Sequence, residues 1–256
     1  MNKGTKEGIL DEIYLTKELN KKNNRNLWKI FDFDFTDHYA VHVKNLKYGK
    51  VNKKKIWPKA DIFIVKSSNI LESVLKKNNF YLNEYDIKNL KYSPVPYSGI
   101  SVKRRDSKRF QIMKIGVSTF EKLFKNLELG AGASIYCRNS SDLIKNDRVL
   151  EGWNTNWDKF NRYFQNHFDY NIDVNSDLNT FKQIKKISNS LIEKSIINNK
   201  KLNDFIFKGI GNFEEPFTAH YLFQGNEMKF NYSIPFKITT GSGRSKGNFT
   251  IVLKPQ

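Results

Sequence analysis

The 256-residue sequence has a single cysteine, Cys137, and no long apolar run. One cysteine excludes an intramolecular disulfide and a zinc site built from paired thiolates, which favours a reducing compartment. The longest aliphatic or aromatic run covers only residues 62–65, too short to cross a bilayer, and the first residues lack the apolar segment of a secretory signal. We therefore expect no membrane segment and a cytoplasmic location.

Acidic residues are scarce beside basic ones, with 26 Asp and Glu against 44 Lys and Arg and a formal net charge of +18. This balance argues against an acidic small-metabolite enzyme. A field of this sign speeds encounter with polyanions, so nucleic acid is the favoured partner, with ribosome association or membrane-surface binding as alternatives. The 14% aromatic residues predict a folded globular chain, since disordered chains are poor in aromatics.

Several motifs of nucleotide and metal chemistry are missing. There is no phosphate-binding G-x-x-x-x-G-K-[ST] motif, and Gly130-Ala131-Gly132 lacks the third glycine of a dinucleotide site. The four histidines, His38, His42, His167 and His220, show no metal-ligand spacing. We expect each of them to be an ordinary surface or core residue.

Hydrophobic periodicity predicts alternating helices and strands in a single domain without repeats or linkers. Helices are expected at residues 5–22, twice within 69–90, and at 118–128, 157–168 and 176–198. In the 118–128 helix, Ser118 is the expected N-cap and Gly130 the expected end. Strands are expected at residues 27–33, 39–47, 61–65, from 100, and at 219–223, 228–236 and 249–253.

Two short segments together supply a carboxylate and a lysine. Asp61 ends Pro58-Lys59-Ala60-Asp61, before one strand, and Lys103 ends Gly99-Ile100-Ser101-Val102-Lys103, on another strand. Cleavage of a phosphodiester needs a divalent cation to stabilise charge and activate water, and a positive group to position that water. Asp61 would hold the metal and the Val102 carbonyl would complete its site. Lys103 would face water and phosphate, on the strand face that Ser101 shares. The alternative is an aspartate that caps a turn and a lysine on a solvated strand.

These residues resemble the PD-(D/E)xK nucleases and, among them, the HpaII-like and MspI-like type II restriction endonucleases. Pro58, Lys59 and Asp61 look like the metal-binding strand of that family. Residues 99–103 are similar to the family element G-F-S-I-K, in which serine replaces the second acid. Residues 6–14, KEGILDEIY, are similar to the N-K-G-x-x-S-E-I-Y opening of HpaII-like enzymes, which implies that Glu12 is a helix-borne acid.

The resemblance implies an α/β fold of the restriction-endonuclease type, a mixed central sheet flanked by helices. It implies Mg²⁺-dependent hydrolysis of double-stranded DNA at a short specific sequence by Asp61, Ser101, Lys103 and Glu12, with Asp61 and Val102 holding the metal. It further implies a bacterial cytoplasmic enzyme, a homodimer as one possible state, and a companion DNA methyltransferase that need not form a complex with it. Residues 1–130 would form the catalytic core, and residues 131–256 the DNA-recognition part.

Two basic segments are expected to contact DNA. The first follows the lysine directly and comprises Arg104, Arg105, Lys108, Arg109 and Gln111; the second is a Gly- and Ser-rich loop with Ser242, Arg244, Ser245 and Lys246. Arg244 is suited to pair two donors with a guanine edge. The alternatives are a solvated charged face for the first segment and a mobile hairpin tip for the second.

Two other functions stay open at this point. A structure-selective nuclease, such as a junction resolvase, would keep the fold but cut branched DNA regardless of sequence. A DNA- or RNA-binding protein without an active site would use the positive charge alone.

Overall fold

The computed structural model describes residues 3–68, 70–104, 110–168, 171–231 and 234–256, with the side chains of residues 3–5 excepted. The chain divides into two compact units, Met1–Phe110 with Asn203–Ile234, and Gln111–Leu202 with Pro235–Gln256. The sequence analysis expected one domain with its catalytic core ending near residue 130. The division falls at residue 110 instead, and the first unit is completed by residues 203–234, which lie between the two segments of the second unit in the chain.

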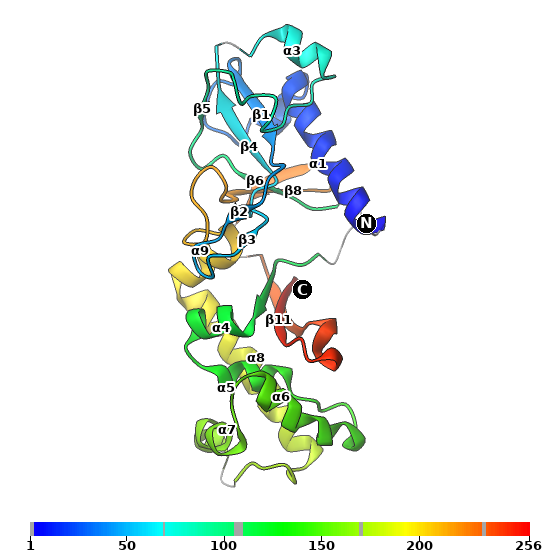
Figure 1. Cartoon of the computed structure of the whole chain (residues 1–256), viewed down its shortest axis with the longest axis vertical. Coiled ribbons are helices and arrows are strands. Elements are labelled where there is room, and N and C mark those ends of the chain that lie inside the picture. Colours follow the sequence, from blue (N-terminus) through cyan, green and yellow to red (C-terminus); the bar gives the residue numbers. More distant parts are fainter. Residues whose placement is uncertain (1–2, 69, 105–109, 169–170, 232–233) are drawn as a thin grey trace. The chain divides into compact units, whose positions relative to one another are not determined.

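The first unit is built on a six-stranded mixed sheet in the order β1-β4-β6-β8-β9, with β5 added beside β4 (Figure 1). Strand β6 runs parallel to β8, and the other pairs are antiparallel. The elements of this unit are α1 (Lys3–Lys21), α2 (Arg25–Trp28), β1 (His38–His42), β2 (Lys47–Tyr48), β3 (Lys55–Ile56), β4 (Ile62–Lys66), α3 (Glu72–Lys77), β5 (Ser93–Pro94), β6 (Ile100–Val102), β8 (Tyr221–Gln224) and β9 (Glu227–Phe230). Helix α9 (Lys200–Lys208) spans the division between the units.

The sheet is buried on both faces because alternate side chains of β4 pack into two different clusters. Ile62 and Ile64 join Leu15 and Leu19 of α1 in one cluster, together with Trp28. Phe63 and Val65 face the other cluster, which the segment around α3 covers. The predicted fold class, α/β with a mixed central sheet flanked by helices, is therefore confirmed.

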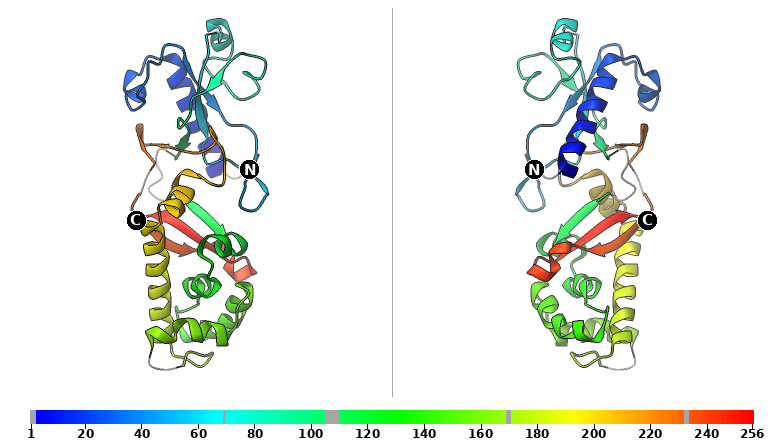
Figure 2. Two further views of the ribbon diagram at one scale, coloured as in Figure 1. Left: turned by 90° about the vertical axis from the view of Figure 1, so that its left-hand side faces the viewer. Right: turned by 90° about the vertical axis from the view of Figure 1, so that its right-hand side faces the viewer.

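The second unit contains a three-stranded antiparallel sheet in the order β10-β11-β7, which Figure 2 shows with β7 in green and the other two strands in red tones. Helices α5 and α8 pack together beside it, and Gly132 of α5 allows Ser188 of α8 to approach closely. The elements of this unit are β7 (Met113–Gly116), α4 (Val117–Phe124), α5 (Leu127–Ser134), η1 (Ser140–Lys145), α6 (Asn146–Gly152), α7 (Trp157–Phe164), η2 (Gln165–His167), α8 (Leu178–Asn198), β10 (Phe236–Thr240), η3 (Ser242–Lys246) and β11 (Thr250–Pro255).

The longer amphipathic helices and the apolar strands agree with the sequence predictions. The predicted helices at residues 5–22 and 176–198 correspond to α1 and α8, and Asp177 caps α8 as expected by accepting from the Thr180 N–H. The buried strand at 61–65 is β4, and the strand expected from residue 100 is β6. Within the described residues, no helix is long and apolar enough to cross a membrane.

Five local predictions are wrong. Helix α4 begins at Val117 after its N-cap Gly116, so Ser118, the expected N-cap, lies inside the first turn. Residues 27–33 form part of α2 and turns, because Trp28 reaches the core by donating its indole N–H to the Leu19 carbonyl. Where two helices were expected within 69–90, the described residues 70–90 hold one helix, α3, followed by turns. Gly130 does not end a helix; it lies inside α5. Helix α4 ends at Phe124, and its C-cap Lys125 has a positive φ of 55°. The strand predicted at 228–236 is two strands, β9 and β10, in different units.

Candidate active site

Asp61 lies at the start of β4, where this strand meets β6. The backbone N–H of Asp61 donates to the Ile100 carbonyl at 2.8 Å, which fixes the two strands beside each other. Its carboxylate Oδ2 accepts from the Val102 N–H at 2.7 Å and is 3.4 Å from the Ser101 hydroxyl. Asp61 and Ser101, which are 40 positions apart in the sequence, are thus joined by hydrogen bonds where the two strands meet.

Lys103 follows β6 directly and is held by the neighbouring strand. Its N–H donates to the Phe223 carbonyl of β8 at 2.8 Å, in continuation of the parallel pairing of Ser101 with Leu222. The Lys103 side chain is half-buried, and its positive charge opposes the rise in the pKa of Asp61. The structure therefore brings Lys103 to Asp61, as the sequence analysis expected.

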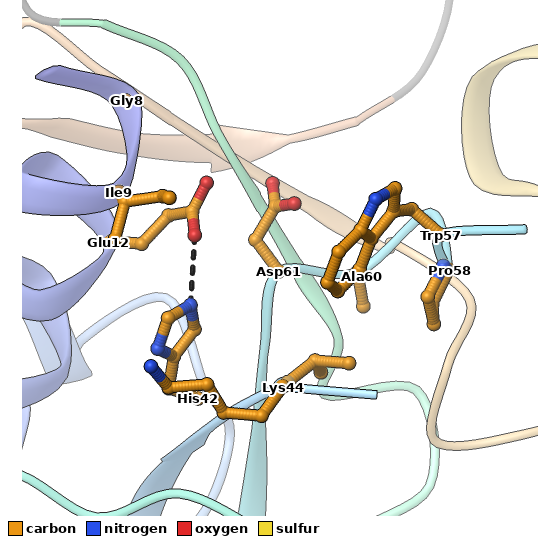
Figure 3. Close-up of a pocket in the computed structure, with 10 residues that line it drawn as sticks. Gly8, Ile9, Glu12, His42, Lys44, Trp57, Pro58, Ala60 and Asp61 are labelled. Carbon is orange, nitrogen blue, oxygen red and sulfur yellow. Dashed lines mark hydrogen bonds and ion pairs between the residues drawn. The ribbon is translucent and has the colours of Figure 1, made fainter. Parts of the chain in front are cut away.

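Glu12 reaches the same place from α1. A cavity of about 540 Å³ is lined by both Glu12 and Asp61, and Figure 3 shows the two carboxylates in its wall. Glu12 Oε2 lies 2.8 Å from His42 Nε2, and His42 Nδ1 lies 2.7 Å from the Tyr81 hydroxyl. Burial raises the pKa of Tyr81 to about 12, so its hydroxyl stays protonated and can donate to Nδ1. The Nε2–H of His42 then donates to Glu12 and fixes its carboxylate.

The site holds charges that are costly without a further partner. Burial raises the pKa of Asp61 to about 6, and the nearby negative charge of Glu12 adds to that rise. Burial also lowers the pKa of Lys59 to about 7, with Lys103 adding to the effect and Asp61 opposing it. Lys59 as a whole is half-buried, but its Nζ is enclosed and donates to the Ile206 carbonyl at 2.8 Å. Two carboxylates in a confined space favour a bound cation.

The donor set suits one divalent cation that prefers oxygen. Among the described residues, no group of three or more His, Cys, Asp and Glu side chains gathers to hold a metal. Mg²⁺, however, is commonly held by one or two carboxylates together with waters and substrate phosphates. The N–H and C=O groups of one residue in a strand point toward the same edge of that strand. Because the Val102 N–H donates to the Asp61 carboxylate, we expect the Val102 carbonyl on the side of Asp61 as well. Asp61, Glu12 and the Val102 carbonyl thus fit Mg²⁺ and do not fit a thiolate-bound zinc.

The first basic segment is only partly described. Arg104 forms an ion pair with Glu7 of α1, so its guanidinium is already engaged. Gln111 is exposed and belongs to the second unit. Arg105, Lys108 and Arg109 lie outside the described residues. Their predicted DNA contacts stay predictions.

The second basic segment forms η3 in the second unit. Ser242, Ser245 and Lys246 are exposed there. Arg244 instead stacks on the Tyr136 ring, with its guanidinium carbon 3.7 Å from the ring centroid, and donates to the carbonyls of Ser134 and Ile135. Arg244 has an internal structural role in this arrangement, and reading a guanine would require these contacts to break.

Sequence reasoning missed His42, Tyr81 and the enclosed position of Lys59. His42 was expected to be an ordinary residue, yet it is only 3% exposed and bonds a carboxylate of the cavity. A signal was present in the sequence, since a histidine among the apolar residues of a buried strand must find polar partners. Lys59 was part of the quoted motif, but the carbonyl that it contacts lies 147 residues further along the chain.

Comparison with known proteins gives a similarity in structure and none in sequence. No protein-family model matches the sequence, and no curated protein matches it. Among solved structures, the chain is similar to the crystal structure of restriction endonuclease MspI in complex with its cognate DNA. The sequence identity is 14%, the match covers 98% of this chain and 90% of that chain, and the TM-score is 0.44. An overlap at this level assigns no role to any individual residue.

Proposed function

We propose that this protein is a magnesium-dependent endonuclease that cuts double-stranded DNA at a specific short sequence. The observation that carries the proposal is that Asp61 and Glu12, from separate elements, line one cavity, and that Lys103 is near enough to Asp61 to oppose the rise in its pKa. Two carboxylates suit a hard cation, and a lysine suits a phosphodiester that gains negative charge as it is cleaved. The net charge of +18 supports a polyanionic substrate.

The chain's own residues divide the work at this cavity. Asp61 and the Val102 carbonyl would hold Mg²⁺, with Glu12 reaching it through water, and the ion when bound supplies charge stabilisation and a more acidic water. Lys103 Nζ donates to the phosphate or to the attacking water and holds them in line. Ser101 donates to Asp61 and keeps its carboxylate turned toward the cavity. His42 does the same for Glu12.

Plasmid cleavage with Mg²⁺, with and without EDTA, tests this proposal. Asp61→Asn and Lys103→Ala should each lower the cleavage rate by about 10²- to 10⁴-fold, since each removes several kcal/mol of transition-state stabilisation. Duplex binding should stay within a few-fold. Glu227→Gln, an exposed acid on β9, is the matched control and should cleave like the wild type. Full activity of both site variants would overturn the proposal.

The pattern of products separates the remaining possibilities. Discrete limit fragments with a common end sequence support a restriction enzyme, for which a companion methyltransferase that protects the same sequence is expected. Nicks confined to branch points would indicate a structure-selective nuclease. Binding without any Mg²⁺-dependent cleavage would indicate a nucleic-acid-binding protein with no active site.

A further inference from the structure

A short hairpin beside the cavity carries a strong excess of positive charge. Strands β2 and β3 pair antiparallel, and we call residues 44–57, which include both strands, the basic hairpin. This segment has six lysines and no acidic residue. Lys53, Lys54 and Lys55 are exposed. Among the residues that the structure describes, no ion pair is found for these three lysines.

The base of the basic hairpin is fixed to the first unit. Lys47 Nζ pairs with Glu84 at 2.6 Å and lies 4.6 Å from the centroid of the Phe217 ring. The Lys50 N–H donates to the Asn212 carbonyl at 2.9 Å. A Cβ on Gly49 would lie 2.7 Å from Asn212 Oδ1, so the glycine is what permits this close approach. These contacts fix the basic hairpin to the first unit, so it is not a free loop.

The opposite face of the basic hairpin is open and carries aromatic rings. Lys47 is paired with Ile56, and Tyr48 with Lys55, so the two pairs lie on opposite faces. Because Lys47 turns toward the body of the unit, Tyr48 and Lys55 turn away from it. Tyr48 is 72% exposed, and Trp57, directly after β3, is 63% exposed.

Trp57 connects this open face to the candidate active site. It lines the same cavity as Asp61 and Glu12, and in the view of Figure 3 the Asp61 carboxylate lies between the Glu12 carboxylate and the Trp57 indole. Trp28 and Trp153 are at most 2% exposed, and Trp157 is half-buried with its indole N–H bonded to Asp147. A large exposed indole at the edge of a cavity that holds two carboxylates has no role in holding the core.

We propose that the basic hairpin holds the DNA strand that is to be cut: Trp57 packs on the nucleoside next to the scissile phosphate of a duplex, and Lys53, Lys54 and Lys55 bind phosphates further along. The inference rests on the proposed nuclease function for the position of that phosphate. Charge complementarity favours a polyanion over a protein partner, since Lys53, Lys54 and Lys55 are exposed side by side and the hairpin itself contains no acidic residue. Exposed aromatic rings pack against bases and sugars whatever the sequence, so the hairpin gives position and not specificity.

Tryptophan fluorescence tests the contact without any cleavage. Mixed-sequence duplex is titrated into the wild type in Ca²⁺, in place of Mg²⁺, while binding is followed separately by anisotropy of a labelled duplex. Emission should fall on binding in the wild type and stay unchanged in Trp57→Phe, which keeps a ring at that position. Trp57→Ala should bind roughly 5- to 100-fold more weakly. Tyr97→Ala, which removes an exposed ring outside both this cavity and the basic hairpin, should bind like the wild type.

Salt dependence tests the lysines. Replacing Lys53, Lys54 and Lys55 by Gln together should weaken binding and reduce the slope of log affinity against log salt by about 2.7, at about 0.9 for each lost phosphate contact. The matched control changes the exposed residues Lys76, Lys77 and Lys88 to Gln and should leave that slope unchanged. Equal slopes in the two triple variants would overturn the role of the lysines.

The possible results separate this inference from the proposed function. Duplex binding with no change in Trp57 emission would overturn the hairpin contact and leave the nuclease proposal standing. Quenching by single-stranded but not by duplex DNA would overturn the duplex as the occupant. Quenching by duplex with no cleavage in Mg²⁺ would support the hairpin contact while the nuclease proposal fails.

Discussion

Asp61 is held where its charge is unfavourable. The Val102 N–H and the Ser101 hydroxyl orient the carboxylate, but burial and the neighbouring Glu12 raise its pKa to about 6. Perturbed carboxylates of this kind gather at functional sites because a bound ligand relieves the cost. The carboxylate is held by hydrogen bonds in a place where its ionised form is disfavoured, which distinguishes Asp61 from an aspartate that only caps a turn.

The raised pKa of Asp61 makes the stability of the metal-free protein depend on pH. Because the folded pKa is about 6 and the ordinary value is 3.8, ionised Asp61 destabilises the folded state above pH 6, and the effect fades as the pH falls toward 4. Asp61→Asn should therefore melt about 2–6 °C higher than the wild type at pH 7.5, for a gain of about 1–2 kcal/mol after allowance for its half-burial. Near pH 4 the wild type and Asp61→Asn should have the same melting temperature. Thermal melts in EDTA at both pH values measure this.

Calcium supplies the control for that experiment. Ca²⁺ at neutral pH should raise the melting temperature of the wild type and not that of Asp61→Asn, since only the former offers both carboxylates. An Asp61→Asn protein that is less stable than the wild type in EDTA at pH 7.5 would contradict the cost assigned to Asp61.

His42 should act through Glu12 and not on the substrate. Its Nε2 lies 2.8 Å from Glu12 Oε2, so His42→Phe leaves the carboxylate unsupported. Cleavage by Glu12→Gln should fall less than cleavage by Asp61→Asn, because Glu12 is expected to reach the metal through water. His42→Phe should raise the Mg²⁺ concentration needed for half-maximal cleavage. His42→Gln, which retains an N–H donor, should recover part of the loss.

A double variant shows whether the two residues form one unit. Glu12→Gln combined with His42→Phe should be no slower than Glu12→Gln alone, since removal of the acid leaves the histidine nothing to position. Losses that simply add would show that His42 acts independently.

At the residue scale, the sequence identified the acids and the lysine but not their support. Asp61, Ser101 and Lys103 stand in two short motifs, and the expectation that two apolar strands pair was enough to join them. His42 acquires its role from Glu12 and Tyr81, which lie 30 and 39 residues away. No local pattern encodes such contacts, because they depend on how β1 is placed in the sheet.

At the element scale, glycine was the least reliable signal. Gly130 follows an amphipathic segment, as a helix-ending glycine does, but in α5 it serves as a contact point for the Trp153 ring. The aromatic residues near Trp28 likewise suggested a strand, although a short helix buries them equally well. Periodicity fixed the long helices, whereas short elements are decided by packing that the sequence does not display.

Adding one methyl group to Gly130 tests this interpretation. A Cβ there would lie 2.3 Å from the Trp153 ring, so Gly130→Ala should destabilise the second unit by about 1–3 kcal/mol despite the better helix propensity of alanine. Gly8 in α1 is the matched control, since its Cβ would meet nothing within 4 Å, and Gly8→Ala should stabilise by about 0.5–1 kcal/mol. Urea denaturation measures both. Equal effects at the two glycines would show that the Trp153 contact does not govern Gly130.

At the scale of the whole molecule, the active-site strand depends on residues that come more than a hundred positions later. Strand β6 pairs in parallel with β8, so Ser101 lies opposite Leu222, and the chain between them includes residues 111–202, the larger part of the second unit. Two parallel strands need a crossover connection between them, but no local sequence pattern indicates that this connection will contain most of a second unit. The sequence analysis therefore placed the end of the catalytic core near residue 130, without the strands that complete its sheet.

This interleaving predicts that residues 1–130 will not fold alone. The fragment lacks Leu222 and Phe223, which are at most 5% exposed, and the loss of about 1.5–3 kcal/mol for each is large beside a typical total stability of about 5–15 kcal/mol. A chain that joins residues 1–110 to residues 203–234 through a flexible Gly/Ser linker restores β8 and β9 and should unfold cooperatively in urea, with Ca²⁺ raising its midpoint. Circular dichroism of the two chains decides the matter. A cooperative transition in the 1–130 fragment would contradict this dependence of β6 on β8.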